Sequence, residues 1–135
     1  MALIEWDDSL SVQVAEFDQQ HKTLIATINE LYEAMKAGKA KEVLKKILNS
    51  LIRYAASHFK TEEDYFAQFG YPDAENHKKE HTDFVQKVTD LRTRCGEKGV
   101  SLTIDVMNFL SGWLNKHIMH TDKQYSQFFN EKGLR

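Results

Sequence analysis

Six histidines stand out in a chain of 135 residues. The imidazole nitrogen of histidine is a frequent metal ligand in proteins. Five of these histidines and one glutamate stand three or four positions from apolar residues that recur with helical spacing, which predicts that they lie on the inward faces of helices. The six inward polar residues are His21, His58, Glu62, His77, His81 and His117.

The spacings within this set differ in what they indicate. His58 and Glu62 are four residues apart, a separation that arises by chance on many helices. His77 and His81 have the same separation, and this pair is more specific for a metal because the spacing aims two imidazoles at one point. A single inward histidine is more often a hydrogen-bonded core residue. Here every predicted helix carries one, and burying so many polar groups without partners is costly, so we predict a shared metal site.

Four segments with a helical period carry these faces, and glycine-containing breaks separate them. The connections are only a few residues long, so consecutive helices are expected to pack antiparallel. We therefore predict an all-α fold, an up-down-up-down antiparallel four-helix bundle, in a single domain of residues 1–135. The expected helices span about 18–37, 40–69, 73–95 and 102–128, and residues 1–17 form an N-terminal arm that lies across the bundle.

The order of the histidines along these helices predicts where the site lies. His21 is early in the first helix and His58 is late in the second. His77 is early in the third helix and His117 is late in the fourth. Because neighbouring helices run in opposite directions, all four positions meet at the same end of the bundle.

Composition excludes several other classes of protein. One proline and six glycines are too few for the turns of a many-stranded β fold. A net charge of −2 without a long basic run argues against nucleic acid or an anionic membrane as partner. No apolar run approaches the roughly 18 residues of a membrane span. The single cysteine, Cys95, suits a reducing compartment, so we expect a cytoplasmic protein in which Cys95 is passive packing.

Read in order, the motifs form one pattern over almost the whole chain. It begins with His21, preceded by Asp-Gln-Gln, and continues with HFKTE at 58–62, HKKEH at 77–81 and HIMHTD at 117–122. This succession of H, HxxxE, HxxxH and HxxxxD resembles the bacterial single-domain hemerythrins. The resemblance implies a four-helix bundle with two iron ions, a non-haem di-iron centre with an oxo or hydroxo bridge, and reversible binding of dioxygen.

The resemblance also implies roles for individual residues. The ligands divide into a three-histidine group, a two-histidine group and two carboxylates that bridge the metals. It assigns His77, His81 and His117 to one iron, His21 and His58 to the other, and Glu62 and Asp122 to the bridges. The implied oxygen pocket is apolar and consists of Leu24, Phe59, Trp113, Leu114 and Ile118.

Three polar residues near the last motif need separate interpretation. Asp122 follows His117 by five residues, a step that turns about 140° around an ideal helix. Either the helix loosens there, or the site is wide enough for a bridge between two metals. His120 matches no family ligand and is interpreted as a bystander. Tyr125 is a candidate hydrogen-bond donor to the ligands, but we expect a tyrosine at the boundary of the core.

A count of donors favours oxygen binding over oxidation chemistry. Five imidazoles, two bridging carboxylates and one bridging oxygen leave one position open on two six-coordinate irons, on the ion with two histidines. Di-iron bundles that oxidise substrates carry more carboxylates, as Glu on two helices and Glu-x-x-His on the others. The nitrogen-rich set should leave less drive to cleave dioxygen.

The prediction is therefore a protein that is not an enzyme and that stores, transports or delivers oxygen. An oxygen-consuming enzyme is a candidate recipient, and a monomer or weak oligomer is expected. Three alternatives stay open: a di-iron enzyme, a sensor of oxygen, nitric oxide or redox state that acts through a partner, and a bundle that only sequesters metal.

Overall fold

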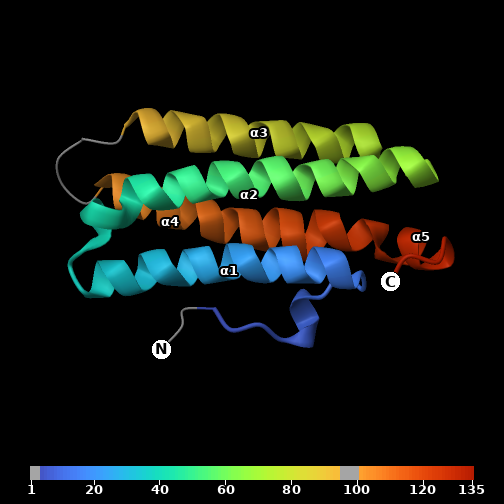
Figure 1. Ribbon diagram of the computed structural model, residues 1–135, viewed down its shortest axis with the longest axis horizontal. Coiled ribbons are helices and arrows are strands. Elements are labelled where there is room, and N and C mark those ends of the chain that lie inside the picture. Colours follow the sequence, from blue (N-terminus) through green and yellow to red (C-terminus); the bar gives the residue numbers. More distant parts are fainter. Residues whose placement is uncertain (1–3, 95–100) are drawn as a thin grey trace.

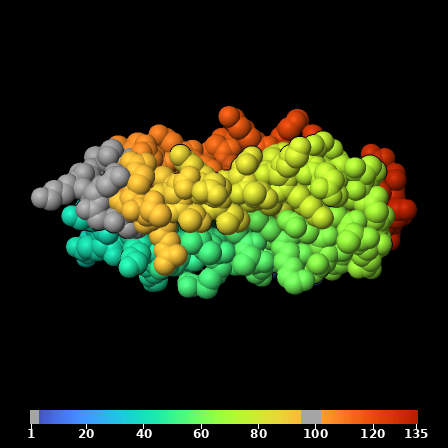
Figure 2. Space-filling model, turned by 90° about the horizontal axis from the view of Figure 1, so that it is seen from above, coloured from blue at the N-terminus to red at the C-terminus, as the bar shows by residue number. Residues whose placement is uncertain are grey.

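The computed structural model describes residues 4–94 and 101–135, and it confirms an all-helical four-helix bundle. Within these residues no strand occurs. Four long helical stretches lie side by side, and both the α1–α2 and α2–α3 connections are short (Figure 1). Seen from above, α3 lies beside α2 along the length of the molecule (Figure 2). The α-helices are α1 (Ala15–Lys36), α2 (Ala40–Phe69), α3 (Ala74–Thr93), α4 (Ser101–Trp113) and α5 (Ser126–Glu131).

Glycines end the first two helices in the way the sequence predicts. Gly38 follows α1 with φ +71°, and Gly70 follows α2 with φ +72°, a conformation that other residues rarely adopt. The backbone N–H groups of Gly70 and Tyr71 both donate to the Phe66 carbonyl, at 2.9 and 3.1 Å. These bonds satisfy the end of α2, whose bounds match the predicted 40–69. No helix in the described part of the chain is long and apolar enough to cross a membrane.

The first and third helices differ from prediction at their ends. α1 begins at Ala15, so Phe17 belongs to this helix rather than to the arm, and its side chain is fully buried. α3 ends at Thr93, and Cys95, predicted as passive packing, lies outside the described residues.

The fourth stretch is not the single helix predicted over 102–128. α4 gives way to a π-helical segment, Leu114–Thr121, and then to a 3₁₀ turn, Asp122–Tyr125, before α5 begins. The N–H of Asp122 donates to the carbonyl of His117, five residues earlier. A bond of this span adds one residue to the turn, so residues five apart come to the same face. The helix therefore loosens between His117 and Asp122, which was one of the two alternatives.

The N-terminal arm packs along α1 and reaches the fourth stretch. Ile4 exchanges two hydrogen bonds with the side chain of Asn29 in α1, at 2.9 and 2.8 Å. The hydroxyl of Ser126 donates to the carbonyl of Val12 at 2.6 Å. In Figure 1 the arm runs beneath α1. The second contact ties the arm to the end of the bundle where α5 lies.

Two apolar clusters fill the interior. The larger is mostly aliphatic and runs along all four helical stretches. The smaller is rich in aromatic side chains and lies where α1, the end of α2 and α5 meet. Its buried members are Val12, Val14, Phe17, Phe66, Tyr71, Tyr125 and Phe129. The polar residues of the predicted site contact both clusters, since Phe17 and Phe66 pack on His58 and His77, and Phe59 packs on His81.

Candidate metal centre

All seven residues predicted as ligands are brought together in the interior. None of their side chains is more than 3% exposed. Three helices supply them with regular geometry, and the fourth stretch supplies two across its π-helical segment. α1 contributes His21, α2 His58 and Glu62, α3 His77 and His81, and the fourth stretch His117 and Asp122. His120 is exposed, so its side chain points away from this cluster.

The seven residues form two overlapping groups that could each hold a metal ion. In each group the candidate ligand atoms lie within 4.8 Å of one another. Glu62 and Asp122 belong to both groups, and the histidines divide between them. One group contains His77, His81 and His117, and the other contains His21 and His58.

Each carboxylate turns one oxygen toward each group. On the three-histidine side, Glu62 Oε1 lies 2.9 Å from His81 Nε2, and Asp122 Oδ1 lies 2.8 Å from His77 Nε2. On the other side, Glu62 Oε2 lies 3.4 Å from His58 Nε2, and Asp122 Oδ2 lies 3.0 Å from His21 Nε2. This is the arrangement expected of two carboxylates that bridge a pair of metals.

Several of these inward atoms have no hydrogen-bond partner in the described residues. They include the Nε2 atoms of His81 and His117 and both oxygens of Asp122. These atoms lie at ion-pair distances, with His81 Nε2 2.9 Å from Glu62 Oε1 and His117 Nε2 2.8 Å from Asp122 Oδ1, but they do not meet the geometry of a hydrogen bond. Buried polar groups in native proteins are almost always satisfied. The donor set therefore fits metal ions, and imidazole with carboxylate suits iron.

The charges in the cluster depend strongly on one another. Burial would raise the pKa of Glu62, but His58, and after it His77 and His81, together outweigh burial and hold that pKa well below its usual value. Burial would lower the pKa of His77, but Asp122 and Glu62 raise it to about 10. Two anions and neighbouring imidazoles thus hold each other charged, and a metal cation would take the place of those protons.

Comparison with known proteins decides the family. The model of the hemerythrin HHE cation binding domain matches residues 12–129. The chain belongs to the hemerythrin family. A bacteriohemerythrin of Methylococcus capsulatus is 34% identical over 126 residues, 93% of this chain and 95% of the relative. A bacteriohemerythrin of Stenotrophomonas maltophilia is 31% identical over 126 residues, 93% of this chain and 81% of the relative.

Solved structures agree with this membership. The crystal structure of a wild-type hemerythrin matches with a TM-score of 0.81 and 34% identity, covering 93% of this chain and 97% of the other. An L114A mutant of hemerythrin matches with the same TM-score and identity, covering 94% of this chain and 97% of the other. The buried His/Glu/Asp cluster is thus a hemerythrin-like metal site in a hemerythrin-like fold.

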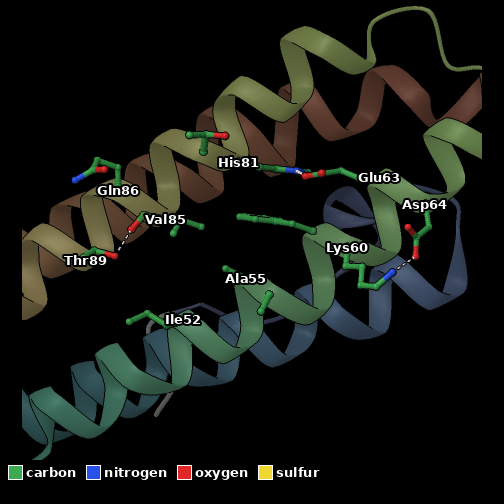
Figure 3. A pocket seen from close by; sticks show the side chains of 12 residues that line it. Ile52, Ala55, Lys60, Glu63, Asp64, His81, Val85, Gln86 and Thr89 are labelled. Atoms are coloured by element: carbon green, nitrogen blue, oxygen red, sulfur yellow. Dashed lines mark hydrogen bonds and ion pairs between the residues drawn. The ribbon is translucent and has the colours of Figure 1, made fainter.

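Three residues outside the ligand set of this hemerythrin-family site each contact the Nδ1 atom of one ligand histidine and hold its ring in orientation. His58 Nδ1 contacts Gln20 Oε1, His81 Nδ1 lies 2.8 Å from Glu63 Oε2, and His117 Nδ1 lies 2.9 Å from Glu80 Oε1. Figure 3 shows Glu63 of α2 reaching His81 of α3 at one end of a surface groove. Such partners fix which ring nitrogen faces the metal.

These three partners were not predicted from the sequence. Gln20 directly precedes His21, Glu63 directly follows Glu62, and Glu80 directly precedes His81. The one signal for these partners was a polar residue directly next to a ligand in the sequence. It is weak, because such residues are ordinary on the outer faces of helices.

Tyr125 corrects the expectation of a tyrosine at the boundary of the core. Its side chain is fully buried, and its hydroxyl donates to Glu62 Oε2 at 2.5 Å. The prediction was wrong because the π-helical segment and the 3₁₀ turn rotate the residues after His117 further inward than one continuous α-helix would. Tyr125 therefore orients a carboxylate of the site.

The five residues predicted as an oxygen pocket are all buried beside the histidines. The Phe59 ring stacks on His81 with centroids 3.8 Å apart, and the Trp113 ring stacks on His117 at 3.9 Å. Leu24, Leu114 and Ile118 belong to the larger apolar cluster. The surroundings of the site are therefore apolar on the side that faces the middle of the bundle.

Proposed function

We propose that this chain binds dioxygen reversibly at a di-iron centre and stores, transports or delivers it, for example to an oxygen-consuming enzyme of a bacterial cytoplasm. One observation carries the proposal. Two buried carboxylates divide their oxygens between a group of three histidines and a group of two. This inequality leaves the two halves of the site with different numbers of protein donors.

The residues would act in two sets. His77, His81 and His117 would hold one iron, His21 and His58 the other, and Glu62 and Asp122 would span both. When bound, the iron pair would supply an open position and two electrons for reversible uptake of dioxygen. Three histidines and two carboxylate oxygens give one metal five protein donors, and two histidines with two carboxylate oxygens give the other four. A solvent-derived bridge would fill one more place on each, which would leave one place beside His21 and His58.

The apolar wall would keep this place dry. Leu24, Phe59, Trp113, Leu114 and Ile118 exclude water, and with it the protons that would promote irreversible oxidation of iron. The donor set favours binding without further chemistry. It has five imidazoles but only two carboxylates, whereas di-iron bundles that oxidise substrates carry more carboxylates. The relatives called bacteriohemerythrin and the hemerythrin structures support the same proposal.

The absorption spectrum of the iron-loaded protein tests this function. About two irons per chain are expected, with a visible band that appears when the ferrous protein is aerated and disappears on removal of oxygen, over repeated cycles. Conversion to a ferric spectrum in the first cycle, with no recovery, would instead favour an enzyme or a sensor.

Two leucine variants separate the wall from the ligands. Leu114→Ala is expected to speed the loss of reversibility while iron content stays at wild-type level, because it opens the wall to water. Leu48→Ala is the matched control, since Leu48 is also a buried leucine but lies in α2, ten residues before His58. Equal rates of oxidation in both variants, or loss of iron from Leu114→Ala, would contradict the role of Leu114.

A further inference from the structure

Tyr54 carries a buried hydroxyl that the ligand set does not use. The residue lies in α2, one turn before His58. Its hydroxyl oxygen is fully covered, and it has no hydrogen-bond partner among the described residues. A buried tyrosine normally finds a partner, because an unsatisfied hydroxyl loses its bonds to water without replacement. An orphaned donor so close to the site indicates a partner that is not part of the chain.

The register of the helices places Tyr54 in the layer next to the histidines. Each helical stretch has a residue three or four positions from its own histidine, toward the middle of the bundle. Because neighbouring helices are antiparallel, these positions share one level along the bundle axis. The layer consists of Leu24, Tyr54, Phe84 and Leu114. Two of its members form the proposed apolar wall, and Tyr54 alone in it carries a hydroxyl.

Ring contacts fix the direction of this hydroxyl. The Tyr54 ring stacks on His58, with centroids 5.2 Å apart and 22° between the planes. It meets the edges of Phe59 at 6.3 Å and Phe84 at 6.5 Å. A tyrosine ring held on three sides has little rotational freedom, so its oxygen is held at a fixed place beside the two-histidine group.

The Tyr54 hydroxyl differs from the other buried tyrosine hydroxyl beside the site in having its proton free. A tyrosine hydroxyl carries its proton at neutral pH. Tyr125 has already donated its proton to Glu62 Oε2, whereas Tyr54 has no partner among the described residues. The Tyr54 proton is therefore available to a bound ligand.

We propose that the Tyr54 hydroxyl donates a hydrogen bond to a small ligand that carries or gains negative charge beside His21 and His58. The inference rests on the proposed function, because it needs a ligand at the place left by the unequal groups of histidines. It adds a specificity-determining residue to an otherwise apolar wall. Small anions and polarisable diatomic ligands should bind more tightly than they would beside hydrocarbon alone.

Azide binding to the di-ferric protein tests the role of Tyr54. Azide is a small linear anion, and its binding is followed by absorption at known iron content. Tyr54→Phe removes only the hydroxyl, so we expect affinity for azide to fall about tenfold while two irons per chain remain. Tyr65→Phe is the matched control, because Tyr65 lies on the same helix and its hydroxyl is exposed beside Glu16. This control should bind azide as wild type does.

Thermal unfolding of the metal-free variants gives a readout that does not depend on iron. Tyr54→Phe should raise the melting temperature by about 2–6 °C, because the hydroxyl is buried without a partner when no ligand is bound. A lowered melting temperature would mean that the chain itself satisfies the hydroxyl, and would overturn the proposal.

The azide results separate the two claims. Unchanged affinity in Tyr54→Phe, with iron content intact, would overturn the role of Tyr54 and leave the proposed function standing. A wild-type protein that holds no pair of irons would overturn both.

Discussion

α2 and the stretch from α4 to α5 each supply one histidine and one bridging carboxylate, but they do so with different backbones. In α2, His58 and Glu62 are four residues apart on a regular helix. In the other stretch, His117 and Asp122 are five residues apart, and the backbone is π-helical between them. Both pairs present their side chains to the same two groups of ligands.

Both stretches place a histidine and a carboxylate in the same site, and the backbone of each adapts to the number of residues between the two ligands. Four residues make about one turn of an α-helix, whereas five make about one turn of a π-helix. An isolated π-helix is unfavourable, so the segment needs support from its surroundings. Thr121 and His117 both donate to Glu80 of α3, at 3.0 and 2.9 Å, which ties the segment to its neighbour.

The largest effect is expected when either carboxylate loses its charge. Glu62→Gln and Asp122→Asn keep the shape of the side chain but remove an anion that faces both groups. Iron content should fall from about two to below one per chain in both variants, measured by elemental analysis. Asp64→Asn is the control, because Asp64 is an exposed residue of α2 that pairs with Lys60. Full retention of iron by one variant alone would break the equivalence of the two pairs.

A second effect is expected in the pH dependence of the metal-free protein. Burial would lower the pKa of His77, but Asp122 and, after it, Glu62 raise it from 6.5 to about 10. A raised folded-state pKa gives stability that is fully present below pH 6.5 and is lost as pH rises toward 10. After chelation the melting temperature should therefore fall by several degrees between pH 6.5 and 10.

The same experiment compares the two carboxylates. Asp122→Asn and Glu62→Gln should each flatten this pH dependence, because both carboxylates raise the pKa of His77. A melting temperature that rises over this range, or a slope that either substitution leaves unchanged, would contradict this account of His77.

A smaller effect is expected from the residues that contact the Nδ1 atoms of His117 and His58. His117 Nδ1 donates to the carboxylate of Glu80, whereas His58 Nδ1 contacts the amide oxygen of Gln20. A carboxylate partner makes an imidazole a stronger donor to metal. Glu80→Gln should weaken metal affinity about tenfold, and Gln20→Glu should strengthen it, both measured by competition with a chelator. Changes of the same sign in both variants would contradict this account of the partners.

The smallest effect is expected from deletion of His120. This exposed residue lies inside the π-helical segment, and its removal leaves His117 and Asp122 four residues apart, as in α2. The segment can then close as an α-helix and still place both ligands on one face. Iron content should stay near two and the melting temperature should change by less than about 3 °C. Loss of iron would show that the π-helical geometry itself is required.

The fold and six of the seven candidate ligands follow from the periodicity of the sequence. His21, His58 and His117 interrupt regular apolar stripes, and a stripe is a local property that a single sequence reveals. Asp122 did not follow from that rule. Its place depends on a loosened helix, and only the family resemblance identified it.

The site residues that could not be predicted from the sequence are placed by contacts between helices. Tyr125 was placed at the boundary because a regular helix was assumed after Asp122, and the π-helical segment moved it into the core. Gln20, Glu63 and Glu80 have the pattern of ordinary surface residues, and only the packing of α1 on α2 and of α3 on its two neighbours brings them to the histidines. No periodicity encodes such pairings.

Anomalous diffraction at the iron edge, from crystals of the iron-loaded protein, tests the central claim most directly. The account predicts two peaks per chain, one among His77, His81 and His117 and one beside His21 and His58. Glu62 and Asp122 should each contact both peaks. A single peak, or two peaks that share neither carboxylate, would contradict the bridged pair on which the proposed function rests.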